Sequence, residues 1–195
     1  MASCSGTRNL PQGELLYVGA KIKVEGNETP KKERKALKTA IEAIVRPKPN
    51  SAFLGFRPKL FIYKIAGTPK KQKGFRYWLK TKVGEAPVYY SKVDLAYNKL
   101  VLQNNAENDG YFNTKATADS IRSGKKVTAE YTVIPKIQYC IRVITFPQDS
   151  KVLSSAVREN EDGTLLKKDQ GYNLTTIKEE RLRIDARLKE KGFYY

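Results

Sequence analysis

Few side chains in this chain could do covalent or metal chemistry. The sequence has two cysteines, Cys4 and Cys140, and no histidine. Without histidine the usual general base, proton shuttle and commonest metal ligand are missing, and two cysteines without a CxxC pair do not form a structural zinc site. The acidic residues show no clustering at fixed spacing, and neither a GxxxxGKS/T nor a GxSxG motif is present. The sequence predicts a protein that is not an enzyme and has no cofactor or metal.

Positive charge is the strongest compositional feature. The net charge is +17, and residues 30–82 alone hold 16 Lys and Arg against Glu33 and Glu42, a net +14. Such a segment is either a solvated cationic face or a contact with an anionic surface, meaning lipid headgroups or an acidic partner protein. The predicted basic face consists of Lys31, Lys32, Arg34, Lys35, Lys38, Lys70, Lys71 and Lys73.

A basic nucleic-acid-binding protein is the alternative that this charge leaves open. Against it, the sequence has no recognition-helix, aromatic-platform or zinc signature. Nucleic acid is therefore not the expected partner.

The first elements follow from apolar periodicity. Residues 14–25 alternate as a strand. Thr29-Pro30 predicts a helix start, with Thr29 as N-cap, and the helix should end before Pro47. Shorter helices are expected at 57–66 and at 75–82, the second packing Trp78 and Leu79, with a polar linker at 68–74 between them.

A longer helix and a hairpin come next. Ser91 and Asp94 resemble a capping box before a helix that runs to about Asp109, and Gly110 is placed to stop it. Residues 111–121 and 126–134 should form a hairpin around Ser123-Gly124.

After Pro135 the pattern begins again. We expect a strand at 137–146, helices at 149–159 and 174–191, and a stop at Gly192. Cys140, inside the expected strand, should be a buried free thiol.

The two long helices form a repeat. With Gly110 aligned on Gly192, the two apolar stripes coincide at helical spacing, and "GYF" in the first copy corresponds to "GFYY" in the second. The unit is strand, helix, helix, Gly-aromatic, then hairpin. The second copy has no hairpin before Tyr195, so we expect this chain to be a fragment of a longer protein.

This order resembles the polypeptide-transport-associated (POTRA) domains of TamA/BamA-type outer-membrane assembly proteins, and within them the lipoprotein variant, TamL. The segments that carry the resemblance are "LPQGELLYVGAKIKV" (10–24), "RPKPNSAFLGFRPKLFIYKIAG" (46–67), "GEAPVYYS" (84–91) and "NDGYFNTK" (108–115). It implies an α+β fold of β-α-α-β-β modules, in which helices cover a small mixed sheet. By this resemblance one module would be complete, with extra helices, and one would be truncated.

The resemblance also implies a domain plan and a function. Residues 1–12 would be a lipoprotein tether, 13–135 a first POTRA-like domain with a helical insertion at about 47–83, and 136–195 a second domain cut before its hairpin. The chain would bind unfolded outer-membrane proteins and a TamB-like periplasm-spanning protein at the periplasmic face of the outer membrane. It would pass clients to a carboxy-terminal β-barrel outside this chain.

Two sites follow from the resemblance. "MASC" places Ala and Ser before Cys4, as in the last positions of a lipobox, which implies that Cys4 carries the lipid anchor. The first hairpin strand would lie at the sheet edge and accept an extended client strand. The residues of this client-strand edge are Asn113, Lys115, Thr117, Asp119 and Ile121.

Overall fold

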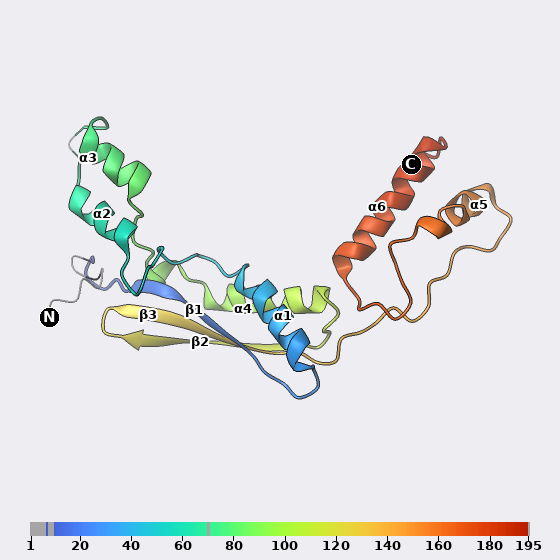
Figure 1. Ribbon diagram of the computed structural model, residues 1–195, viewed down its shortest axis with the longest axis horizontal. Coiled ribbons are helices and arrows are strands. Elements are labelled where there is room, and N and C mark those ends of the chain that lie inside the picture. Colours follow the sequence, from blue (N-terminus) through green and yellow to red (C-terminus); the bar gives the residue numbers. More distant parts are fainter. Residues whose placement is uncertain (1–6, 8–9, 70, 195) are drawn as a thin grey trace. The chain divides into compact units, whose positions relative to one another are not determined.

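The computed structural model describes residue 7, residues 10–69 and residues 71–194. The fold is α+β, with the element order strand, helices, hairpin, helices (Figure 1). Contacts divide the chain into two units. The first holds Met1–Lys23, Lys38–Leu102 and Ala116–Val133, and the second holds Val24–Leu37, Gln103–Lys115 and Ile134–Tyr195.

A three-stranded mixed sheet lies at the centre of the first unit. Its order is β1 (Leu16–Val24), β3 (Lys126–Ile134), β2 (Lys115–Ser123). β1 runs parallel to β3, because the Leu16 N–H donates to the Lys125 carbonyl at 2.9 Å and Lys21 pairs with Glu130 at 3.6 Å. β2 and β3 form the predicted antiparallel hairpin.

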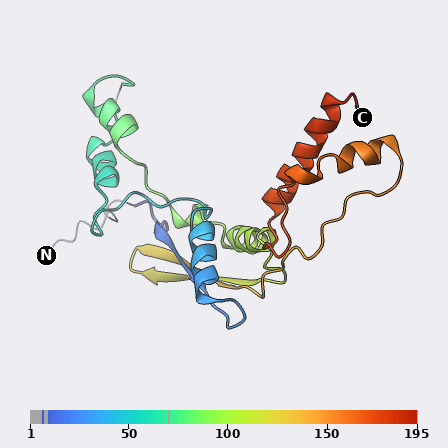
Figure 2. The ribbon, with the colours of Figure 1, turned by 45° about the vertical axis from the view of Figure 1, so that its right-hand side comes forward.

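β3 shows why one face of this sheet is covered. Val127, Ala129, Tyr131 and Val133 are buried, whereas the residues between them are half-buried. The period of two confirms the strand prediction. Helices α1 (Lys31–Glu42) and α4 (Leu95–Asn108) lie over the buried face, which Figure 2 shows from a second direction. Within the first unit they contribute Ile41 and Leu102 to the core.

The cap of α4 differs from the predicted capping box. The Asp94 carboxylate accepts the Tyr97 N–H at 2.8 Å, so Asp94 itself caps the helix. Ser91 lies in a short 3₁₀ turn, Tyr90–Lys92, and donates to Glu14 instead. The prediction that Thr29 is the N-cap of α1 was also wrong. The Thr29 hydroxyl donates to the Lys136 carbonyl at 2.9 Å, and the Pro30 carbonyl accepts the first helical hydrogen bond, from the Arg34 N–H.

Two short helical segments follow α1, as predicted. They are α2 (Pro58–Ala66) and α3 (Phe75–Trp78), and α3 continues as a π-helix, Leu79–Val83, that packs against α2. The prediction that Trp78 is packed was wrong, since Trp78 is 50% exposed and stacks on Phe75.

In the second unit, α5 (Val152–Arg158), a 3₁₀ turn (Glu161–Gly163) and α6 (Leu174–Glu190) occupy the expected positions, and α5 packs on α6. The strand predicted at 137–146 is absent from the described residues, which show a single bridge there between Cys140 and Gly171. A strand needs a continuous partner, and only 139–141 pairs, with 169–172. Cys140 is consequently an exposed free thiol, not a buried one.

The ends of α4 and α6 are alike, as the repeat predicts. Gly110 has φ 86° and Gly192 has φ 85°. In each case the next residue donates its N–H back five residues, from Tyr111 to Ala106 at 3.0 Å and from Phe193 to Leu188 at 3.1 Å. Both helices end in a Schellman motif, which requires a left-handed residue and so favours glycine.

Candidate strand-binding edge

The two edges of the sheet differ in what covers them. The outer side of β1 is occupied at its start, where the Tyr17 N–H donates to the Val88 carbonyl at 2.9 Å and the Tyr90 N–H to the Leu15 carbonyl at 2.8 Å. The Asn50 side chain holds this covering segment: its amide donates to the Ala86 carbonyl at 2.7 Å and its carbonyl accepts the Val88 N–H at 3.0 Å. β2 has a neighbouring strand on one side only. β2 is therefore the open edge in the described part of the chain.

The turn of the hairpin sets the direction of the backbone groups in β2. Two residues join the strands, and Gly124 at the first of these positions has φ 59°, as a type II′ turn requires. In this geometry Ser123 and Lys126 form a hydrogen-bonded pair, so every second residue of β2 bonds to β3. The residues between them, Ala116, Ala118 and Ser120, direct their N–H and C=O groups outward.

The residues of the predicted client-strand edge lie as follows. Lys115, Thr117, Asp119 and Ile121 are exposed and alternate along β2 with the half-buried Ala116, Ala118 and Ser120. Asn113 lies outside β2, which begins two residues later than Asn113. It is in a left-handed turn with φ 59°. Exposed polar side chains on an edge strand keep it soluble and discourage edge-to-edge aggregation.

The end of α4 positions the beginning of β2. Tyr111 is 5% exposed, and its hydroxyl lies 3.5 Å from the Glu33 carboxylate of α1. Burial raises the pKa of Tyr111 to about 12, and the neighbouring Glu33 charge adds to the rise. The buried Thr114 hydroxyl donates to the Tyr111 carbonyl at 2.5 Å and so fixes the turn that leads into β2.

An aromatic cluster holds the following segments against this turn. The Phe112 ring meets the rings of Tyr139 and Tyr172 edge-on, each with centroids 5.0 Å apart. The Tyr172 N–H donates to the Tyr139 carbonyl at 2.7 Å, and the Tyr139 N–H to the Gly110 carbonyl at 2.9 Å. The "GYF" phrase therefore joins α4 both to the hairpin and to residues 137–173.

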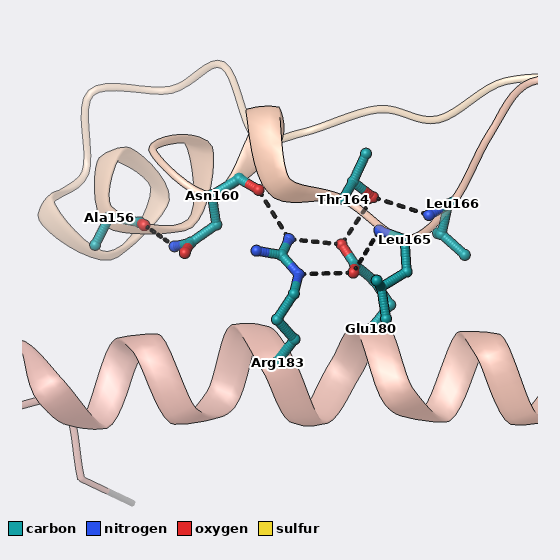
Figure 3. A network of polar contacts seen from close by, with 7 residues as sticks. All are labelled: Ala156, Asn160, Thr164, Leu165, Leu166, Glu180 and Arg183. Atoms are coloured by element: carbon teal, nitrogen blue, oxygen red, sulfur yellow. Dashed lines mark hydrogen bonds and ion pairs between the residues drawn. The ribbon is translucent and has the colours of Figure 1, made fainter.

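The most buried charged side chain of the described residues is Glu180 on α6, which lies outside the strand-binding edge. Glu180 is 5% exposed, and its carboxylate accepts from the Thr164 hydroxyl at 2.8 Å and the Leu165 N–H at 3.0 Å (Figure 3). The Arg183 guanidinium donates two hydrogen bonds of 2.9 Å to the same carboxylate and one of 2.8 Å to the Asn160 carbonyl. The hydrogen bond from Arg183 is the main reason that the pKa of Glu180 falls to about 2. This network attaches the 160–165 turn to α6.

The residues of the predicted basic face divide between two elements. Lys31, Lys32, Arg34, Lys35 and Lys38 lie on α1, where Lys38 pairs with Glu42 at 3.5 Å. Lys71 and Lys73 are exposed in the linker between α2 and α3. Lys70 lies outside the described residues, as does Cys4.

No helix in the described part of the chain is both long and apolar enough to cross a bilayer. The same residues contain no group of three or more Cys, Asp or Glu side chains arranged to hold a metal ion.

Sequence reasoning missed two features. The first is the buried Glu180 network, which no periodicity reveals, because Glu180 sits beside Glu179 in an ordinary charged helix. The second is a set of exposed apolar side chains around α2, which the sequence alone could not separate from core residues. The sequence feature that could have indicated this exposure is Gly55, which lies between Phe53 and Phe56.

Comparisons with known proteins add little. No protein-family model matches the chain, and no curated protein sequence matches it significantly. Among solved structures, the chain is similar to the crystal structure of POTRA domains 3–5 of BamA from Haemophilus influenzae, at 13% identity and a TM-score of 0.30, over 95% of this chain and 90% of that one. A likeness at this TM-score does not by itself establish a common fold or function.

Proposed function

We propose that this chain is a periplasmic POTRA-like segment of an outer-membrane protein assembly or translocation factor, and that β2 binds extended client polypeptides. The observation that carries the proposal is the open edge of β2, on the opposite side of the sheet from β1, whose outer side is covered at its start. The order β1, α1, α4, β2, β3, with α2 and α3 inserted between α1 and α4, and the mixed sheet support it. The finer reading, a TamL-like lipoprotein anchored through Cys4, rests on the sequence resemblance.

Strand addition suits such a task because it uses backbone groups that every client has. A strand of nine residues spans about 30 Å. The outward N–H and C=O groups of Ala116 and Ala118 and the outward C=O of Ser120 would bond to the client, whereas the side chains of Thr117 and Asp119 are exposed between them. The Ser120 N–H already donates to the Asp119 carboxylate at 2.7 Å. Affinity then comes from the main chain and is largely independent of client sequence.

A proline in β2 tests this proposal. Ala118→Pro removes one outward N–H but leaves the β2–β3 ladder intact, since proline is tolerated where an edge strand faces solvent. We expect a peptide of about ten alternating apolar and polar residues, the pattern of outer-membrane strands, to bind about tenfold more weakly than to the wild type. Isothermal titration calorimetry measures the affinity, and circular dichroism checks the fold.

Thr117→Val is the matched control, because it alters an exposed side chain and no backbone group. Its affinity for the peptide should equal that of the wild type. Unchanged binding by Ala118→Pro, or an equal loss in Thr117→Val, would show that the β2 backbone is not the binding element.

The basic residues of α1 extend the proposal to a partner. Lys31, Lys35 and Lys38 follow helical spacing on one side of α1, and we propose that this stripe binds an acidic surface of a TamB-like periplasm-spanning protein. Reversing Lys31, Lys35 and Lys38 to Glu should weaken that complex by about tenfold at low salt. Surface plasmon resonance with the purified partner measures the change.

A charge-matched control separates a local surface from net charge. Reversing the exposed Lys167, Lys168 and Lys178 changes the net charge equally, and binding should be retained. An equal loss in both triple variants would mean that overall charge, not α1, attracts the partner.

A further inference from the structure

The α2–α3 region has an unusual charge balance. Between Glu42 and Glu85 the sequence contains 11 Lys and Arg and no acidic residue. The same stretch forms α2, α3 and the π-helix, which pack on one another within the first unit. In the structure Glu85 pairs with Lys59 at 3.2 Å and neutralises one of these charges, and the excess of cations that is left complements an anionic partner.

The turn before α2 displays apolar side chains in a strained conformation. Phe53 and Phe56 exchange backbone hydrogen bonds at 2.8 and 2.9 Å, closing a two-residue turn with φ 47° at Leu54 and 79° at Gly55. A left-handed leucine is unfavourable, and asparagine is the usual residue at that position of a type I′ turn. Leu54 is nevertheless 93% exposed and Phe53 71% exposed. Among the described residues of this unit, none covers the Leu54 side chain that the strained turn presents.

The apolar surface continues onto α2. The Phe56 and Phe61 rings contact each other with centroids 5.8 Å apart, and Ile65 lies one helical turn after Phe61. Phe61 is 43% and Ile65 60% exposed. We call Phe53, Leu54, Phe56, Phe61 and Ile65 the apolar tip.

The interior of the α2–α3 pair is filled by other residues. Leu60 and Ala66 are buried, and a Cβ on Gly84 would lie 2.8 Å from the Tyr63 backbone, so the π-helix end packs closely on α2 there. The apolar tip is therefore not the inner face of this helical pair. An exposed apolar surface bordered by cationic side chains is typical of protein segments that lie in the interface of a membrane.

We propose that the apolar tip inserts into the surface of an anionic lipid bilayer, with the surrounding Lys and Arg on the headgroups. Leu54 and Phe53 would enter the acyl boundary, where their exposure no longer costs free energy. The Arg57 guanidinium donates to the Val18 carbonyl at 3.1 Å and so holds the turn on β1, whereas Lys59, which pairs with Glu85 at 3.2 Å, would exchange that partner for the phosphates together with the exposed Lys71 and Lys73. This proposal does not depend on strand binding by β2, since it concerns a different element and a different ligand.

Flotation of the whole chain with lipid vesicles tests the proposal. The probe is phosphatidylcholine vesicles containing about a quarter phosphatidylglycerol, with pure phosphatidylcholine for comparison. We expect binding to the anionic vesicles that weakens, without vanishing, as salt screens the charges. Leu54→Asn creates the preferred Asn-Gly turn while removing the apolar side chain, so the turn is retained, and the partition coefficient should fall by about tenfold.

Val143→Asn is the matched control, because Val143 is 75% exposed and lies in the other unit. It should partition as the wild type does. The emission of Trp78, the single tryptophan, checks without vesicles that α3 is unchanged in each variant. The proposal would be overturned if the chain did not bind anionic vesicles, or if Leu54→Asn partitioned into them as the wild type does. It would also be overturned if light scattering showed a dimer that becomes a monomer in Leu54→Asn.

Discussion

Replacing Arg183 by alanine is expected to destabilise the second unit by about 3 kcal/mol, because the change leaves a buried carboxylate without its cation. Glu180 would keep only the bonds from Thr164 and Leu165, and Asn160 would lose the donor to its carbonyl. Urea denaturation followed by circular dichroism measures the loss in free energy of unfolding.

The comparison variant is Arg187→Ala on the same helix. Arg187 pairs with Glu190 at 3.0 Å, and both side chains are mostly exposed. Removing such a surface pair should cost less than about 1 kcal/mol. Equal effects at Arg183 and Arg187 would contradict the structural role of the network in Figure 3.

The same network predicts how stability depends on pH. Glu180 has a folded pKa of about 2 against an ordinary value of 4.5. A lowered folded pKa contributes stability above the unfolded pKa, so about 3 kcal/mol should be present above pH 4.5 and lost as the pH falls toward 2. Glu180→Gln should flatten the stability profile in that window. An unchanged slope would rule out Glu180 as its source.

Gly110→Ala is the second large effect, expected at about 3 kcal/mol. Alanine in the left-handed region costs about 1–2 kcal/mol. The new Cβ would also lie 2.9 Å from the Tyr172 carbonyl oxygen and 3.0 Å from the Tyr172 Cβ, so either the cap or the aromatic cluster must move. Thermal and urea unfolding of the variant measure the sum of the two costs.

Gly192→Ala separates those two costs. Gly192 has the same Schellman motif and nearly the same φ as Gly110, but nothing lies within 4 Å of its added Cβ. The control should therefore lose only the backbone cost, about 1–2 kcal/mol. Equal losses at the two glycines would mean that the contact with Tyr172 adds nothing.

The sequence predicted best those elements whose signals are local. Alternation identified β3, and Gly110 and Gly192 marked the ends of α4 and α6. The prediction failed at 137–146, where apolar residues looked like a strand but pair only at 139–141. Periodicity reports which residues are apolar, whereas strand formation depends on a partner that is distant in sequence.

The candidate strand-binding edge likewise has features that follow from local sequence and features that depend on distant residues. Of the predicted edge residues, Lys115, Thr117, Asp119 and Ile121 are exposed on β2, and Asn113 lies before it. The sequence could not show that β1 is covered by the segment that Asn50 holds, because that depends on two side-chain hydrogen bonds across the fold. The exposure of the apolar tip was hidden for a related reason: phenylalanine and leucine usually indicate a core.

The parallel pairing of β1 with β3 has a consequence for the order in which the first unit folds. Leu16 bonds to Lys125, so α1, α2, α3 and α4 all lie between the two strands along the chain. The β2–β3 hairpin needs only neighbouring residues and can close early, while β1 must wait for a long-range contact that is slow to form. Until β1 pairs, β3 has no neighbouring strand on the side that β1 later covers. The nascent sheet then has an unshielded side on β3 as well as on β2, which makes this the stage most prone to intermolecular strand pairing.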